Sequence, residues 1–442
     1  MKGGTFTPGQ EKVRPGIYFN FTERANDRVT VGERGRAAIP LILSWGEPKK
    51  IIEIKRESDA SDKLGLDLAE PSLLLLREVR KRANEVLVYR VNEGEKAKAD
   101  LTEGVKVEAK YGGSKGNDIK IRVANNVIDD EAMDVTTFFG AREIETQTVK
   151  NADELKGNEC VAFSGSGVLE EKASVSLSGG SDKEPITGAY TDFLSALETE
   201  SFDVVALPVD EEELKVTFTS FIKRLREDQG IKVQGVVADY DANYEGVVNV
   251  TNGVVLENDK TLSPAETTAW VAGAIAGASL KQSLTFMEYE GAVDVEPRYD
   301  HDETVKRLKK GEFLFTFDGR DKTVTVEKDQ NSLESDAKFS LNKVIRIIDA
   351  FHNDVFRSFK DIIKNRKRTG EDIPVSPDGV SIVQTAVALY LNLLQDDGVV
   401  MDFDPKEDIE IEITAAGDGF IVNVGIQPVG SAEKFYFAVE VR

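Results

Sequence analysis

The stretch from Asp408 to Arg442 reads DIEIEITAAGDGFIVNVGIQPVGSAEKFYFAVEVR. Its first part alternates isoleucine with acidic residues from 408 to 413, and a second apolar run, 420–426, follows the turn signal AGDG. The last part alternates again up to the final residues, with its apolar positions at Phe435, Phe437, Val439 and Val441. Alternation with a period of two indicates half-buried strands, so this stretch predicts three strands.

The third of these strands reaches the end of the sequence, where most chains fray unless something holds them. Such a strand has two possible partners. It can close a sheet of its own domain, or it can add to the sheet of another subunit. The pattern alone leaves both open.

Size and composition indicate a soluble protein of several domains. The chain has 442 residues, too many for one core, with 40% hydrophobic and 31% charged residues. Its formal net charge of −23 argues against a surface for nucleic acid, which needs clustered cations. One cysteine, Cys160, allows no internal disulfide and favours a reducing compartment. The start of the sequence lacks the apolar segment of a signal peptide, and no apolar run is long enough to span a membrane.

Changes in pattern along the chain predict a multidomain α/β and α+β protein. Short strands separated by Gly, Asn and Asp suit a β-sandwich or a barrel, whereas alternating helices and strands indicate a mostly parallel sheet. The expected parts are an N-terminal arm at 1–28, a small α/β domain at 29–91, a β-sandwich at 92–180, an α/β domain at 181–332 and a C-terminal domain at 333–442.

Three helices can be predicted with their details. Ser263, Pro264 and Glu266 form the signature of a capping box, so a helix should begin there. Further on, apolar residues recur every three or four positions from 341 to 362 and again from 382 to 393. This spacing predicts a long amphipathic helix followed by a second one.

The N-terminal arm holds one short alternating run among several Gly and Pro residues, formed by Val13, Ile17, Phe19 and Phe21. A single strand's worth of apolar residues has no local partner. We therefore expect this segment either to be disordered or to pair elsewhere.

Patterns for enzyme chemistry are mostly missing from the sequence. The two histidines, His301 and His352, lie in no context typical of a catalytic triad, and Cys160 lies in a strand-like run that suggests burial. Residues 239–250 begin like a calcium loop but lack its central Gly and final Glu. No phosphate-binding loop occurs. We expect no catalytic residue, metal or cofactor.

Two other features have both a structural and a functional interpretation. Gly273 and Gly277 share one face of a helix, which lets another backbone approach, most simply within the same domain. The densest cationic run contains Lys364, Arg366, Lys367 and Arg368. These cations suit the C-terminal end of a helix dipole, and they could instead contact an acidic partner.

Several stretches together resemble one known family. They lie in the same order as in that family and span nearly the whole chain: Gly4–Gly9, Arg14–Phe21, Gly35–Leu41, Ala109–Gly112, Gly116–Ile119, Thr268–Gly273, Gly291–Val295, Gln427–Val429 and Glu433–Phe437. With these stretches the chain resembles contractile phage tail sheath proteins, particularly those of Gram-positive prophages and phage-tail-like bacteriocins.

The resemblance implies a structural protein that forms hexameric rings, stacked helically around a tail tube. Its partners would be neighbouring sheath subunits and the tail tube, baseplate and tail terminator proteins, in a particle assembled in the bacterial cytoplasm. The resemblance also implies a subtilisin-like fold without peptidase activity for residues 181–332. Finally, it implies that both terminal arms add strands to neighbouring subunits. If the chain is a sheath protein, the cationic residues Lys364, Arg366, Lys367 and Arg368 are our candidates for contact with an acidic surface of the tube.

Two rival interpretations remain. A soluble multidomain hydrolase would place a deep polar pocket in residues 181–332 and would be active as a monomer. A sheath of the type VI secretion kind is normally built from two polypeptides, whereas one chain here resembles the whole sheath.

Overall fold

The computed structural model describes residues 4–5, 18–19, 29, 32, 34–335 and 337–441, with the backbone alone at 4–5 and 18–19. The chain divides into two compact units. The first comprises Met1–Gly32 and Ala350–Gly430, and the second comprises Glu33–Asp349 and Ser431–Arg442. Each unit is described by itself.

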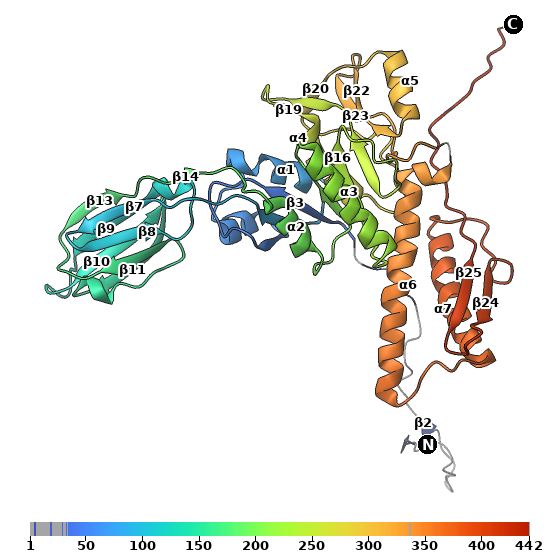
Figure 1. Ribbon diagram of the computed structural model, residues 1–442, viewed down its shortest axis with the longest axis horizontal. Coiled ribbons are helices and arrows are strands. Elements are labelled where there is room, and N and C mark those ends of the chain that lie inside the picture. The colour runs from blue at the N-terminus through green and yellow to red at the C-terminus, as the bar shows by residue number, and fades with distance from the viewer. Residues whose placement is uncertain are drawn as a thin grey trace. The chain divides into compact units, whose positions relative to one another are not determined.

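A mixed sheet forms the centre of the second unit (Figure 1). Among the described residues, it contains seven strands in the order β21-β17-β16-β15-β3-β5-β4. Six of them run parallel and β4 runs antiparallel to β5. Their bounds are β3 Arg36–Leu41, β4 Ile51–Ile54, β5 Glu85–Arg90, β15 Val204–Ala206, β16 Gln234–Ala238, β17 Val247–Val250 and β21 Glu312–Phe313.

Helices cover both faces of this sheet, so alternate strand residues enter two different cores. Ala37 of β3 packs in the core that contains residues of α1 (Leu74–Arg80) and α4 (Pro264–Gly277). Its neighbour Ala38 packs in the core that contains residues of α2 (Ala189–Leu197) and α3 (Glu212–Glu227). A parallel sheet covered on both sides needs apolar residues at every position, which explains the continuous apolar runs in these strands.

This sheet joins two parts of the chain that we predicted as separate domains. The strands of residues 29–91 lie beside those of residues 181–332, because Ala37 and Ala38 of β3 pair with Val204 and Val205 of β15. The apolar runs at β3 and β15 each predict a buried strand, but they carry no information about which strand lies beside which. The structure therefore places the α/β strands of both ranges in one sheet.

A β-sandwich is inserted between β5 and β15. One of its sheets has the order β11-β10-β9-β13 and the other β12-β8-β7. The bounds are β7 Lys98–Thr102, β8 Val105–Ala109, β9 Ile119–Asn125, β10 Met133–Phe139, β11 Arg142–Val149, β12 Val161–Gly165 and β13 Lys172–Ser176. Two short strands, β6 (Gly94–Glu95) and β14 (Ser181–Asp182), pair where the chain enters and leaves the sandwich. The sandwich confirms the prediction from the short, turn-separated strands.

Smaller elements complete the second unit. One sheet has the order β19-β18-β20, and β22 pairs with β23. Their bounds are β18 Gly253–Leu256, β19 Thr261–Leu262, β20 Ala292–Glu296, β22 Phe315–Asp318 and β23 Thr323–Val326, and α5 is His301–Lys309. The capping box at α4 is present as predicted, since the Ser263 hydroxyl accepts a hydrogen bond from the Glu266 amide and the Glu266 carboxylate accepts one from the Ser263 amide.

The first unit contains most of α6 (Asn342–Thr369), which begins in the second unit, and α7 (Pro377–Asp396). Strands β24 (Ile409–Ile413) and β25 (Phe420–Val424) follow and form an antiparallel hairpin. Two short strands, β1 (Gly4–Thr5) and β2 (Tyr18–Phe19), pair in parallel. The Tyr390 hydroxyl of α7 donates a 2.6 Å hydrogen bond to the buried Asp354 of α6, which joins the two long helices.

Candidate interaction surfaces

Metal-ligating clusters and a reactive thiol are two features that enzyme chemistry could use. Within those residues, no group of His, Cys, Asp and Glu side chains could hold a metal ion, and the calcium-like start at Asp239 belongs to no such group. Cys160 is buried, as its sequence context predicts, and burial raises the pKa of its thiol to about 11. Such a thiol carries very little of the nucleophilic thiolate at neutral pH.

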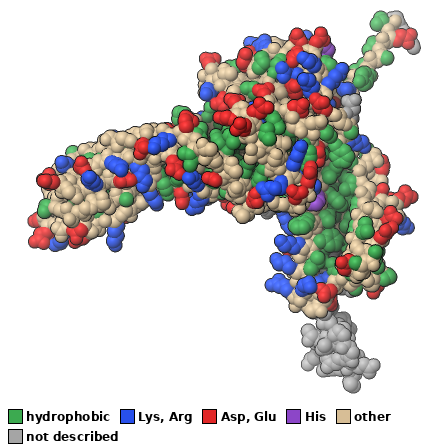
Figure 2. Space-filling view, in the orientation of Figure 1, with side chains coloured by type: hydrophobic (Ala, Val, Ile, Leu, Met, Phe, Trp, Pro, Cys, Tyr) green, Lys and Arg blue, Asp and Glu red, His purple; other side chains and the backbone are tan. Residues whose placement is uncertain are grey.

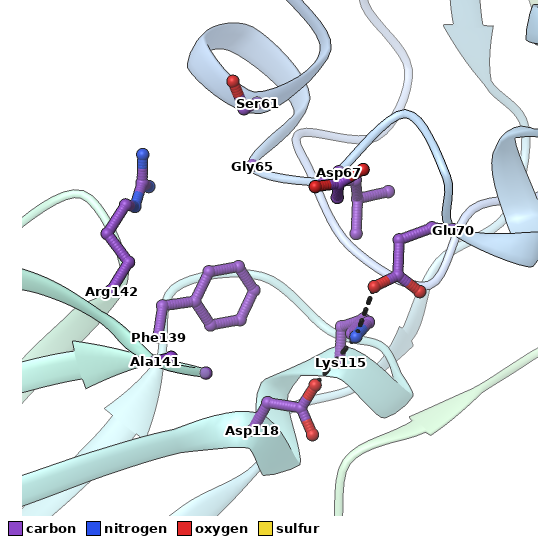
Figure 3. A pocket seen from close by; sticks show the side chains of 11 residues that line it. Ser61, Gly65, Asp67, Glu70, Lys115, Asp118, Phe139, Ala141 and Arg142 are labelled. Atoms are coloured by element: carbon purple, nitrogen blue, oxygen red, sulfur yellow. Dashed lines mark hydrogen bonds and ion pairs between the residues drawn. The ribbon is translucent and has the colours of Figure 1, made fainter.

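One cavity of about 340 Å³ lies where the β-sandwich joins the sheet (Figure 3). Lys115 stands at its wall and forms ion pairs of 2.7 Å with Glu70 and 2.8 Å with Asp118. The rival hydrolase interpretation expects a polar pocket formed by residues 181–332. All residues that line this cavity lie between 61 and 142, so it does not provide that pocket.

The membrane prediction can be compared with the helices directly. No helix in the described ranges is long and apolar enough to cross a bilayer. The small, apolar run that starts at Ala269 instead lies in α4, where it is buried against the sheet.

The terminal strand predicted at 435–441 is not formed in the isolated chain. Residues 435–441 are described and adopt no strand, and they pair with neither β24 nor β25. Their apolar side chains are strongly exposed: Phe435 70%, Phe437 85%, Val439 83% and Val441 92%. A strand needs a neighbour for its backbone hydrogen bonds, and this segment has an apolar, alternating sequence without such a neighbour.

The N-terminal candidates can be placed only in part. Val13, Ile17 and Phe21 lie outside the described residues. Phe19 belongs to β2, whose backbone pairs with β1 through Thr5. Their contact with another subunit stays a prediction.

Among the described residues, the hairpin of β24 and β25 forms a sheet of two strands, and no described strand pairs with either outer edge. Ile413, Ile421 and Val422 are exposed on it. An isolated two-stranded hairpin is marginally stable, and its edges are a template for further strands. The hairpin is therefore a candidate site for strand addition.

The cationic run lies in the last turns of α6, where blue side chains gather on the surface (Figure 2). Lys364, Lys367 and Arg368 are exposed, whereas Arg366 is half-buried. Arg366 pairs with Glu371 at 3.5 Å and Lys367 with Asp372 at 3.2 Å. The two acidic partners follow shortly after the run in the sequence, so their spacing is a local signal for this charge pairing.

The sequence matches family models over nearly all of its length. Residues 34–91 match the tail sheath protein Gp18 domain III N-terminal region, and residues 92–182 match the phage tail sheath protein beta-sandwich domain. Residues 184–332 match the phage tail sheath protein central domain, and residues 334–442 match the phage tail sheath C-terminal domain.

Whole-length relatives agree with these matches. The chain is 53% identical to the phage-like element PBSX protein XkdK of Bacillus subtilis over 100% of both chains. Its sequence is 46% identical to that of the sheath tail protein Lin1278 from Listeria innocua. The crystal structure of that protein matches with a TM-score of 0.81 over 93% of this chain and 96% of that one. The Desulfitobacterium hafniense sheath tail protein DSY3957 is 39% identical, with a TM-score of 0.84 over 97% and 100%.

A more distant structure shares the fold alone. It is the helical sheath of the anti-feeding prophage in its contracted state, at 14% identity and a TM-score of 0.60 over 98% of this chain and 99% of that one. The mixed α/β multidomain fold is thus that of the sheath proteins of contractile injection systems, which are structural proteins and not enzymes. The chain belongs to the phage tail sheath protein family.

Proposed function

We propose that the chain is the structural subunit of a contractile tail sheath. Its copies polymerise as stacked hexameric rings around a tail tube and contract to drive the tube through the envelope of a target cell. The observation that carries this proposal is the exposed segment 435–441, whose alternating sequence is typical of a strand but which pairs with no strand among the described residues of its chain.

Strand addition links the subunits. The terminal segment of one copy adds to the open hairpin of β24 and β25 in a neighbour, and the N-terminal run from Val13 to Phe21 adds in the same way. Each backbone hydrogen bond contributes only about 0.5–1.5 kcal/mol net, but several act together along a strand. Such links hold while the Gly and Pro residues beside them change conformation.

Contraction then needs no nucleotide. The extended sheath is metastable, and rotation and compression of its rings release packing free energy. The solved contracted sheath with the same fold supports two packing states for subunits of this kind. The absence of a phosphate-binding loop from the sequence agrees with this energy source.

Residues 181–332 supply a rigid body for these movements. We assign them a subtilisin-like fold without its catalytic triad. Their parallel strands, covered by α3 on one face of the sheet and by α4 on the other, support this assignment.

Partners in the particle are the tail tube, the baseplate and the tail terminator. The particle is phage-tail-like, of a prophage or bacteriocin kind, and assembles in the bacterial cytoplasm before release.

Electron microscopy tests the proposal. The chain is co-expressed with the neighbouring tube gene and examined by negative stain, and hollow cylinders of uniform diameter are expected. A variant with Phe435→Ser and Phe437→Ser should give no cylinders, because one face of the added strand loses its apolar contacts.

A variant with Tyr436→Ser and Glu440→Ser is the matched control, since these two residues lie on the opposite face of the same segment. All four side chains are exposed in the isolated chain, so neither variant disturbs the folded subunit. Cylinders from the Phe435 and Phe437 variant would refute strand addition by this arm.

A further inference from the structure

The first residues of the C-terminal segment are attached to the second unit, although the segment follows the hairpin of the first. Contacts group Ser431–Arg442 with Glu33–Asp349. Within residues 431–441, Glu433 alone is partly buried, and the others are exposed. The segment is therefore held near Glu433 and free beyond it.

The hydroxyl group of Thr285 holds Glu433. Thr285 accepts hydrogen bonds from the Asp329 amide at 3.0 Å and from the Ser283 hydroxyl at 3.2 Å. Both of its acceptor positions are thereby used, so its one proton points to the remaining partner. That partner is the carboxylate of Glu433, with an Oγ1–Oε1 distance of 2.8 Å.

A second contact lies two residues earlier. The ammonium group of Lys343 donates a 3.0 Å hydrogen bond to the hydroxyl of Ser431. Lys343 belongs to the first turns of α6 and is only 7% exposed, unlike most lysines, which keep their charge in water. A buried lysine with one directed partner fixes the position of that partner.

A small cluster of buried charges lies beside these two contacts. Lys343 and Arg346 are two buried cations, and the buried Asp329, 3.8 Å from Arg346, supplies a single negative charge. Burial and the neighbouring Arg346 lower the pKa of Lys343. A buried surplus of positive charge is costly, so the side chains of this cluster are held in fixed positions by their surroundings.

The guanidinium group of Arg346 is only partly hydrogen-bonded among the described residues. Its Nη2 donates to the carbonyl oxygen of Gln282, whereas its Nε and Nη1 are buried without a hydrogen-bond partner. Burial raises the pKa of Asp329, and the negative charge of Glu433 adds to this rise. Glu433 is thus near enough to act on this charged cluster.

We propose that Thr285, Lys343, Ser431 and Glu433 form a clamp, called here the arm clamp, that fixes the point at which the terminal strand leaves the subunit. Beyond the clamp the free part is Phe435–Arg442, which spans at most roughly 26–29 Å when extended. An open clamp frees the chain from Gly430 onward and lengthens this reach to roughly 40 Å.

The consequence for assembly rests on the strand addition proposed above, whereas the clamp itself does not. A short free strand can reach a neighbour only at a set distance, so a closed clamp restricts which ring geometries the link permits. An open clamp permits more of them.

Trypsin tests the clamp in the isolated, full-length protein. Lys434 follows Glu433 directly, and cleavage after it releases the peptide Phe435–Arg442. A protease needs several residues on both sides of the cleaved bond to be free of other contacts. The wild-type protein should release this peptide roughly tenfold or more slowly than a synthetic peptide of residues 430–442, because opening must precede cleavage.

Thr285→Val removes the hydroxyl but leaves the cleaved sequence unchanged, and it should restore most of the free peptide's rate. Thr316→Val is the matched control, since Thr316 also donates to a glutamate, Glu327 at 2.9 Å, but contacts no part of the segment. Ser431→Ala, in the exposed segment itself, tests the Lys343 contact without risk to the fold. Release is measured by mass spectrometry at early times.

Two results would overturn the clamp: wild-type protein that is cleaved as fast as the peptide, or a Thr285→Val variant that is cleaved as slowly as wild type. Failure of the chain to form cylinders with its tube would refute the proposed function and would leave these cleavage rates as they are. The two proposals therefore fail by different measurements.

Discussion

The backbone of Gly273 lies against the carbonyl oxygen of Val79, so closely that a Cβ atom on Gly273 would come well within 3.0 Å of this oxygen. One turn further along α4, Gly277 has the same relation to the carbonyl oxygen of Arg82. The helices α1 and α4 thus pack backbone to backbone on one face of the sheet. This contact fits the simpler of the two interpretations of the glycine pair, which is close packing within one unit.

Gly273→Ala should destabilise the protein by about 1–3 kcal/mol, although alanine is intrinsically better in a helix by about 1 kcal/mol. The packing effect wins because a carbonyl oxygen of the main chain cannot rotate away as a side chain can. Urea unfolding followed by circular dichroism measures the change. Gly319→Ala, where the nearest atom is 3.9 Å away, is the control and should stay within about 0.5 kcal/mol of wild type.

Arg226 and Asp349 form a buried ion pair with two hydrogen bonds of 2.6 and 2.9 Å, and their side chains are 4% and 11% exposed. Replacing Arg226 with Met should cost about 3–5 kcal/mol of unfolding free energy, because Asp349 is left charged and buried. The double variant Arg226→Met with Asp349→Leu should be more stable than this single variant. Chemical denaturation of all three proteins measures the difference.

A matched comparison is available on the same helix. Arg224 pairs with Glu198, but their side chains are 42% and 34% exposed. Arg224→Met should therefore cost no more than about 1 kcal/mol. Equal losses for Arg224 and Arg226 would contradict the burial argument.

The thiol of Cys160 should react slowly with iodoacetamide in the folded protein. Burial raises its pKa to about 11 from an ordinary value of 9.0, which leaves about a hundredfold less thiolate near pH 8. The alkylation rate should keep rising as the pH passes 9 and approaches the pKa near 11. Denatured protein in urea is the control. If the alkylation rate of the folded protein levels off just above pH 9 instead, the thiol is exposed and has its ordinary pKa.

Reversing the exposed charges near the end of α6 should weaken assembly with the tube and leave the subunit folded. The variant carries Lys364→Glu, Lys367→Glu and Arg368→Glu. Its folding cost is limited to about 0.3–1 kcal/mol for each unfavourable charge near the helix end. Co-sedimentation with purified tube measures the loss.

The control reverses Lys106, Lys120 and Arg122, three exposed cations on the β-sandwich, so the net charge changes equally. If both triple variants bind the tube as wild type does, the cations of α6 make no contact with the tube and serve only to complement the helix dipole.

Local signals in the sequence predicted most of the elements. The capping box at Ser263 marks the start of α4, and the stripe from 341 to 362 marks α6. Strand β8 alternates between buried and outer-facing residues along its length, which is the local pattern that indicates a strand. These features depend on neighbours in the sequence, which is why they can be found there.

Features that join distant residues could not be predicted in this way. The pairing of Ala37 with Val204 unites two ranges into one sheet, and any apolar strand could have taken either place. Strand β11 carries no apolar alternation that could predict it, because its residues are mostly polar and exposed. The contact of Glu433 with Thr285 depends on a hydroxyl whose other bonds come from Asp329 and Ser283, and no pattern within the segment indicates them.

The insertion of the sandwich between β5 and β15 determines the order in which the protein can fold during synthesis. Of the strands in this sheet, β3, β4 and β5 leave the ribosome first, and β3 must wait for β15 until the chain has been made as far as residue 206. At roughly 5–20 residues per second, this delay lasts roughly 5–20 s. The sandwich has all its strands in one continuous range and can fold within that time, whereas the apolar edge of β3 stays open. The nascent chain therefore passes through a stage with one finished domain and one unfinished sheet, and at that stage a chaperone protects it best.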